Sequence, residues 1–256
     1  MLRTRVIPVL LLHNKGLVKT VRFKDPKYVG DPINAIRIFN EKEVDELIFL
    51  DIDASKEHRE PDYALIESFA SECFMPVCYG GGITNVEQIR KVFSLGIEKV
   101  ALNSSALRDK DLIREASQLF GAQSIIVAVD VKRNLWGRYQ IYRHADKGVQ
   151  KGDLLAYLRE VEALGAGEVF LNSVDMDGMQ KGYDMTLLQT VRDVISVPVI
   201  VCGGAGQLSD FKAAKELGGA SAVAAGSFFV FQGKHRAVLI TYPKYEELEK
   251  LFGEQP

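Results

Sequence analysis

The amino-acid sequence predicts an α/β fold, a single closed barrel of eight parallel strands in which each strand is followed by a helix. Short apolar runs alternate with longer amphipathic stretches along the whole of the 256-residue chain. Each apolar run is nearly continuous, which is typical of a strand that is buried on both faces of a parallel sheet. Eight such units in a chain of this length favour a (βα)8 barrel over an open doubly wound sheet.

The eight predicted strands are apolar runs bounded by polar residues or glycines. Amphipathic stretches lie between them, and those at 86–96, 110–121, 153–165 and 208–219 end in glycine, as helices often do. The segment 140–152 is predicted to be a β-hairpin or a loop excursion after the fifth strand, with Trp136 and Tyr142 as packing residues. In chain order the expected strands are residues 6–11, 46–51, 76–79, 99–102, 124–130, 168–172, 198–202 and 222–225.

An internal repeat supports the barrel and divides it into two halves. Residues 75–105 align with residues 197–227 at a constant offset of 122. Such a repeat indicates duplicated half-barrels of about residues 1–122 and 123–256. No linker-like composition separates the halves, so we expect one domain that covers residues 1–256. The paired residues include Glu46 with Glu168, Pro76 with Pro198, Gly81 with Gly203, Gly82 with Gly204 and Ser105 with Ser227.

Composition and charge argue against several classes of function. The formal net charge of −2 predicts no general affinity for nucleic acid or for a membrane. No stretch approaches the length of a transmembrane helix, and the apolar start of the chain fits a first strand better than a signal peptide. The three cysteines and four histidines lack metal-ligand spacing, so we expect no metal and no other cofactor. Scattered, reduced cysteines are typical of a cytoplasmic protein.

Two glycine clusters, at 80–82 and 203–206, each follow a predicted strand and precede a predicted helix. Glycine there lets backbone N–H groups approach a ligand closely, and phosphate often binds at such loops in barrels. The repeat places a second polar strand end beside each cluster, which suggests a substrate with two phosphates. The alternative is a pair of tight turns without a ligand. The candidate phosphate-binding residues are Gly81, Gly82, Asn103 and Ser104 in one half, and Gly203, Gly204, Gly226 and Ser227 in the other.

Acidic residues gather at predicted strand ends, on the face where barrels keep their active sites. Asp130 ends the apolar run "IIVAV", so we interpret it as a general acid or base. Asp51 and the pair Asp177–Gly178 are candidate substrate contacts, whereas a turn or cap role is favoured for Asp53 and Asp175. Lys19 follows the first strand, after a loop that could fold over the barrel mouth.

Charged residues also stand at the beginning of four predicted strands. Arg5, Glu46, Lys99 and Glu168 would converge on the barrel axis at its N-terminal end. Buried charges of alternating sign are costly unless they are paired, so a ring of ion pairs is expected. The ring could plug the bottom of the barrel, or it could be a gate that admits a small molecule.

With these residues in view, the sequence resembles the cyclase subunit of imidazole glycerol phosphate synthase over essentially its whole length. The resemblance rests on "DELIFLDIDAS", "GGGI" with "NSS", "FGAQSIIVAVDVKR", "EVEALGAGE", "DMDGMQKGYD" and "GGAG". It implies a barrel that receives ammonia from a glutaminase partner docked on the N-terminal face. The ammonia passes through the barrel core and reacts with a bis-phosphate ribonucleotide at the C-terminal face.

The resemblance also implies roles for single residues. Arg5, Glu46, Lys99 and Glu168 match the ammonia gate, so the gate interpretation now outweighs the plug. Asp130 matches one of the family's two catalytic aspartates, and Lys19 matches a loop lysine that contacts substrate. The matches to substrate and phosphate positions are Gly82, Asn103, Asp177, Gly204 and Ser227.

Three positions depart from the family pattern. Leu11 stands where the other catalytic aspartate should end the first strand, Asn172 replaces a small hydroxyl residue, and Met179 replaces a threonine. Loss of a general acid or base typically costs a factor of roughly 10²–10⁴ in rate. This combination is similar to the second-copy branch of the family, which accompanies surface-polysaccharide genes together with a glutaminase and a separate sugar amidotransferase.

Three functions are compatible with these sequence features. The favoured one is an ammonia-receiving subunit that serves the conversion of an acetamido sugar to an acetamidino sugar. The second is an authentic histidine-pathway cyclase that works with Asp130 alone. The third is a non-catalytic scaffold that activates a glutaminase.

Overall fold

Eight parallel strands close into a barrel in the computed structural model, which describes residues 4–146 and 148–253. The strands pair around the barrel in the order β1, β4, β5, β6, β7, β10, β11 and β12, and β12 returns to β1. This is the predicted (βα)8, or TIM, barrel. The barrel strands are β1 Arg5–His13, β4 Leu47–Asp51, β5 Val77–Gly80, β6 Lys99–Leu102, β7 Ile125–Arg133, β10 Glu168–Ser173, β11 Val199–Cys202 and β12 Ala222–Ala225.

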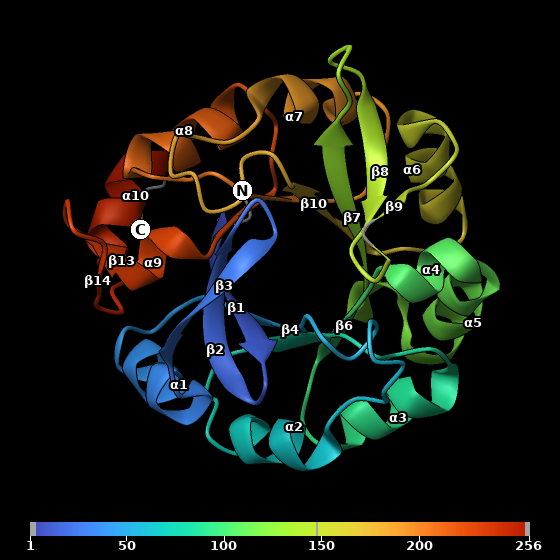
Figure 1. The fold of residues 1–256 in the computed structure, drawn as a ribbon, viewed down its shortest axis with the longest axis horizontal. Coiled ribbons are helices and arrows are strands. Elements are labelled where there is room, and N and C mark those ends of the chain that lie inside the picture. The colour runs from blue at the N-terminus through green and yellow to red at the C-terminus, as the bar shows by residue number, and fades with distance from the viewer. Residues whose placement is uncertain (1–3, 147, 254–256) are drawn as a thin grey trace.

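The helices form an outer ring around the strands. Around this ring the long helices follow one another in chain order from α1 to α8, and α10 lies between α8 and the short helix α9 (Figure 1). Most long helices begin at a side-chain cap: Asp31, Asp62, Asn85, Asp153 and Asp184 each accept a hydrogen bond from a first-turn amide. The helices are α1 Pro32–Glu41, α2 Tyr63–Ala70, α3 Val86–Ser94, α4 Ser104–Arg108, α5 Asp111–Phe120, α6 Leu154–Ala163, α7 Met185–Arg192, α8 Leu208–Glu216, α9 Ser227–Val230 and α10 Tyr245–Phe252, with a 3-10 turn at Ala122–Ser124.

Two hydrophobic cores result from the alternation of side chains along the strands. The larger core lies between strands and helices and contains Phe39, Phe49, Phe69 and Phe211. The smaller one fills the inside of the barrel with aliphatic side chains, Phe170 and two thiols, Cys78 and Cys202. Because residues i and i+2 of a strand share a face, Ile7, Val9 and Leu11 of β1 all belong to the inner set.

The observed strands differ from the predicted ones mainly at their ends. Pro76 and Pro198 were expected inside strands but lie just before β5 and β11. Their carbonyl groups still extend the pairing with the neighbouring strands, because they accept hydrogen bonds from the Leu47 and Val169 amides. Proline lacks an N–H and cannot donate to a strand ladder, which accounts for the shorter strands.

Short antiparallel strands extend the barrel beyond the eight units. After β1, the chain forms β2 Gly16–Val21 and β3 Lys24–Gly30, where the sequence predicted only a loop. The expected hairpin after the fifth barrel strand is present as β8 Tyr139–Arg143 and β9 Gly148–Val149. A last hairpin consists of β13 Phe231–Gln232 and β14 Ala237–Val238.

No helix among residues 4–146 and 148–253 is long and apolar enough to cross a membrane. The duplication of the two half-barrels stays a prediction from the sequence repeat.

Candidate functional site

The C-terminal ends of the barrel strands surround an open pocket of about 1130 Å³. A smaller hollow adjoins it at the end of β10, β11 and β12. The expected substrate-site residues lie around these two cavities: Lys19, Asp51, Gly81, Gly82, Asn103, Ser104, Asp130, Asp177, Gly226 and Ser227 line the pocket, and Gly178, Gly203 and Gly204 line the hollow.

Asp130 of β7 is the most perturbed carboxylate in the pocket. Its Oδ1 accepts a hydrogen bond from Asn172 Nδ2 and its Oδ2 from Asn103 Nδ2, both at 3.1 Å. Burial raises the pKa of Asp130 to about 7, although the two amides favour the charged form. A carboxyl group with this pKa can both take up and release a proton near neutral pH, as a general acid or base must.

Leu11 lines the same pocket from β1, the strand that stands opposite β7 in the ring of eight. It is paired with Leu50 of β4 and with Val18 of β2, and it packs against the inner core. The wall that faces Asp130 across the pocket is therefore aliphatic at this position. A single buried carboxylate, rather than a pair, is available for proton transfer between these two strands.

Lys19 and Asp177 bring the β2–β3 hairpin to the pocket. Lys19 is fully buried, and its ammonium group donates a hydrogen bond to the Val9 carbonyl. Burial lowers the pKa of Lys19 to about 8, against the opposing charge of Asp177. Asp177 Oδ2 accepts hydrogen bonds from Thr20 Oγ1 at 2.7 Å and from the Phe23 amide at 3.0 Å. The carboxylate thus fastens the hairpin turn, and burial raises the pKa of Asp177.

The two glycine loops adopt conformations that only glycine accepts easily. Gly82 has a φ of +73° and Gly204 a φ of +112°. A β-carbon at Gly82 would lie 2.6 Å from the Arg59 carbonyl oxygen, and one at Gly204 would lie 2.1 Å from that of Gly182. Both loops pass so close to neighbouring backbone that no side chain fits, which leaves their peptide groups at the cavity wall.

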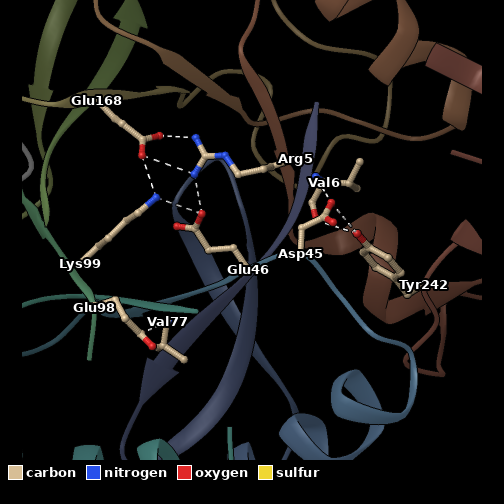
Figure 2. A network of polar contacts seen from close by, with 9 residues as sticks. All are labelled: Arg5, Val6, Asp45, Glu46, Val77, Glu98, Lys99, Glu168 and Tyr242. Carbon is tan, nitrogen blue, oxygen red and sulfur yellow. Dashed lines mark hydrogen bonds and ion pairs between the residues drawn. The ribbon is translucent and has the colours of Figure 1, made fainter. Parts of the chain in front are cut away.

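The four charges at the strand starts meet in one network at the N-terminal end of the barrel (Figure 2). Arg5 binds both carboxylates, with Nη1 2.5 Å from Glu46 Oε2 and Nη2 on Glu168. Lys99 Nζ lies 2.7 Å from Glu168 and 3.2 Å from Glu46. Burial alone would lower the pKa of Arg5, but its contacts with Glu168 and Glu46 outweigh this and raise it. The expected ring of ion pairs is present.

Several pocket residues could not be predicted from the sequence, because they lie in the antiparallel hairpins β2–β3 and β8–β9. Phe23 sits at the β2–β3 turn, and its ring meets His144 edge-on at a centroid distance of 5.2 Å. Tyr142 packs against the same ring at 6.0 Å. Phe23 and His144 line the pocket. The positive φ of Phe23, +61°, marks a tight turn, but "VRFKDP" carries no glycine that would signal it.

The structure differs from the sequence interpretation at three residues, Asp53, Trp136 and Asp175. Asp51, rather than Asp53, makes the turn after β4, because its Oδ1 accepts the amides of Asp53 and Ala54. Asp53 instead holds His13 Nδ1 at 2.8 Å. Trp136 is not a packing residue, since it is 83% exposed at the tip of the β7–β8 hairpin. Asp175, for which a turn or cap role was expected, instead accepts the amide of Arg133, a residue of β7 that is distant in the chain.

Among the residues that the structure describes, no three His, Cys, Asp or Glu side chains come together as a metal site.

Comparisons with known proteins agree with this geometry. The family described as "Histidine biosynthesis protein" matches residues 5–236 of the chain. A Pseudomonas aeruginosa protein provisionally named imidazole glycerol phosphate synthase subunit hisF2 is 55% identical over 249 residues, which cover 97% of this chain and 99% of that protein. A Vibrio vulnificus protein provisionally named as subunit hisF3 is 49% identical over 251 residues, with 98% and 96% covered. A Leptospira interrogans protein provisionally named as subunit HisF is 47% identical over 256 residues, with 98% and 100% covered.

Proposed function

The chain belongs to the histidine biosynthesis protein family, as a second-copy relative of the imidazole glycerol phosphate synthase cyclase subunit, and we propose that it is the ammonia-receiving subunit of a glutamine amidotransferase. A glutaminase would dock on the N-terminal face of the barrel. The ammonia acceptor would be the acetamido group of a sugar for surface polysaccharide, held by a separate sugar amidotransferase. The single observation that carries this proposal is the aliphatic wall at Leu11, opposite a retained Asp130.

The charged ring supports entry of ammonia at the N-terminal end. Each of Arg5, Glu46, Lys99 and Glu168 forms ion pairs within the ring, and their net charge is zero. One oxygen, Glu46 Oε1, is buried without a hydrogen-bond partner among the residues that the structure describes. Above them the barrel interior is apolar, with the Phe170 ring and the Cys78 and Cys202 thiols among aliphatic side chains. Such an interior disfavours a charged ion far more than a small neutral molecule. Neutral ammonia is therefore the nitrogen species that suits this path.

The pocket supports a weakened cyclase chemistry. Ring closure in the family uses two aspartates, whereas here the only carboxylate of that pair is Asp130. The phosphate-site glycines and the charged ring are nevertheless retained. A barrel that keeps the charged ring and the glycine loops but lacks one of the two aspartates is better suited to pass ammonia on than to close the ring itself.

Asp130 also gives a specific reason to keep the cyclase as the second candidate. Its raised pKa, about 7, would let one carboxyl group perform both proton transfers of a slow ring closure. In the third candidate, a scaffold that only activates a glutaminase, Asp130 would have no catalytic role. An Asp130→Asn variant that leaves every activity of the glutaminase complex unchanged would favour the scaffold.

Deletion of the gene in its own organism separates the first two functions. We expect growth without histidine to continue and the acetamidino group to disappear from the surface polysaccharide, as measured by mass spectrometry of its sugars. Reintroduction of the wild-type gene should restore the group, and cells fed amide-¹⁵N-glutamine should carry the label in it. Histidine auxotrophy with an unchanged polysaccharide would refute the proposal and assign the chain to histidine synthesis.

A further inference from the structure

The second half of the chain carries an element after its last barrel strand that the first half lacks. In the register of the sequence repeat, Ser104 corresponds to Gly226. In the first half the next long helix, α5, begins at Asp111, only a few residues after Ser104. In the second half the corresponding helix, α10, does not begin until Tyr245. The additional residues include the β13–β14 hairpin, which directly follows the short helix α9, whose N-cap is Gly226 and whose first residue is Ser227.

This added hairpin is basic. The chain contains no aspartate or glutamate between residues 217 and 245, whereas the hairpin turn consists of Gly233, Lys234, His235 and Arg236. A segment with cations and no compensating acid attracts anions through its local field. The hairpin therefore adds positive charge that the first half of the chain lacks at the corresponding place.

Arg236 makes one contact with another part of the barrel and one within its own hairpin. Its Nη1 donates a hydrogen bond to the Gly178 carbonyl at 3.4 Å. Its guanidinium lies 4.6 Å from the centroid of the Phe231 ring, and Lys27 Nζ of β3 lies 5.3 Å from the same centroid. Stacking on an aromatic ring and a backbone contact hold the planar group in place before any ligand arrives.

Gly178 is also part of the small hollow next to the pocket. The same hollow is lined by Gly203, Gly204, Gly226 and Ser227, the second pair of candidate phosphate loops. A guanidinium has five N–H donors in a rigid plane, which suits the oxygens of a phosphate ester. The contact with Gly178 therefore places Arg236 beside a residue that lines the hollow and still leaves donors for an anion.

We propose that Arg236 is a phosphate-binding residue, which the added hairpin brings to the glycine loops of the second half alone. The ligand is a phosphate monoester at one end of the substrate. This inference rests on the proposed function, since it takes the two sets of glycine loops as phosphate sites. The loop at Gly82 has a different cation in its surroundings, the pocket-lining Lys56, and does not depend on the hairpin.

The test uses inorganic phosphate and the full chain labelled with ¹⁵N. Phosphate is titrated while NMR follows the amides of Gly82 and Gly204, which report on the two sites within one molecule. In Arg236→Gln, we expect phosphate to bind about tenfold more weakly at Gly204 and unchanged at Gly82, as loss of a charge-assisted hydrogen bond implies. Lys234→Gln removes the same charge from the same turn and should change either affinity less than twofold.

Three outcomes of this titration would overturn the proposal. Equal affinities at Gly204 in wild type and Arg236→Gln would overturn the role of Arg236 and leave the phosphate loops intact. An equal loss in Arg236→Gln and Lys234→Gln would also overturn it, because general charge rather than a specific contact would then be responsible. Absence of any phosphate response at both glycines would instead refute the proposed phosphate sites, and the inference with them. An unchanged Gly82 response shows that the variant is folded.

Discussion

Substitution of Glu168 by glutamine tests the charged ring at the N-terminal end of the barrel. The change keeps the shape of the side chain but leaves two cations, Arg5 and Lys99, facing the single carboxylate of Glu46. Side-chain exposure is 27% for Arg5, 18% for Lys99 and 10% for Glu168, so water screens the excess charge only in part. Removal of one partner from a fully buried ion pair costs about 3–5 kcal/mol, and partial exposure reduces our expectation here to about 2–4 kcal/mol.

Equilibrium unfolding in urea, followed by circular dichroism at pH 7.5, measures this cost. With a slope of about 3 kcal/mol per molar urea, the midpoint should fall by about 1 M. Glu216→Gln is the control, since it breaks an exposed pair with Lys212 at 3.8 Å and should cost less than about 0.5 kcal/mol.

A double variant shows whether charge balance is the cause. Lys99→Met together with Glu168→Gln leaves one cation and one carboxylate, Arg5 and Glu46. Its destabilisation should be smaller than the sum of the two single effects by at least about 1 kcal/mol. Additive effects, or a Glu168→Gln variant as stable as the wild type, would refute the reasoning that the ring is held by mutual neutralisation.

Three further predictions concern the pocket. Burial raises the pKa of Asp130 to about 7, from about 4 in an unfolded chain. Ionisation of this group therefore lowers the free energy of unfolding by about 4 kcal/mol as pH rises from 4 to 7. Asp130→Asn should lack that component, and parallel melting-temperature profiles for variant and wild type would contradict it. Asp177→Ala removes the acceptor of Thr20 and Phe23, so amides 20–24 should exchange with deuterium about tenfold faster; Asp175→Ala, the control, should spare them. Gly204→Ala forces a β-carbon to 2.1 Å from a carbonyl oxygen and should cost about 3 kcal/mol or more, against about 1 kcal/mol for Gly137→Ala, where the β-carbon meets open space. Equal urea midpoints for the two glycine variants would show that the Gly204 loop can shift enough to accommodate a β-carbon.

The barrel and its charged ring could be predicted from the sequence because both follow from strand periodicity. All eight strands lie where apolar runs predicted them, and Ala222–Ala225 matches to the residue. Arg5 precedes Ile7 by two positions, so it must share the inner face once the barrel closes. The same argument places Leu11 in the pocket, opposite Asp130.

The hairpins around the mouth could not be predicted in the same way. Five residues of β3, from Lys24 to Tyr28, are exposed, so this strand has no apolar alternation to reveal it. Its position depends on its pairing with β2, and Asp177 holds the end of that hairpin through hydrogen bonds from Thr20 and Phe23. Phe23 and His144 therefore reach the pocket through a contact between two hairpins, which no local pattern encodes.

We propose that Leu11 leaves the barrel without one member of the acid–base pair that closes the ring in the family. The most direct test measures ammonium-dependent turnover of the bis-phosphate ribonucleotide by the wild-type chain and by Leu11→Asp, under identical conditions. We predict that the wild type is slower than Leu11→Asp by a factor of roughly 10² or more, the usual cost of a missing general acid or base. A wild-type rate equal to that of Leu11→Asp, at turnover typical of a cyclase, would contradict the claim.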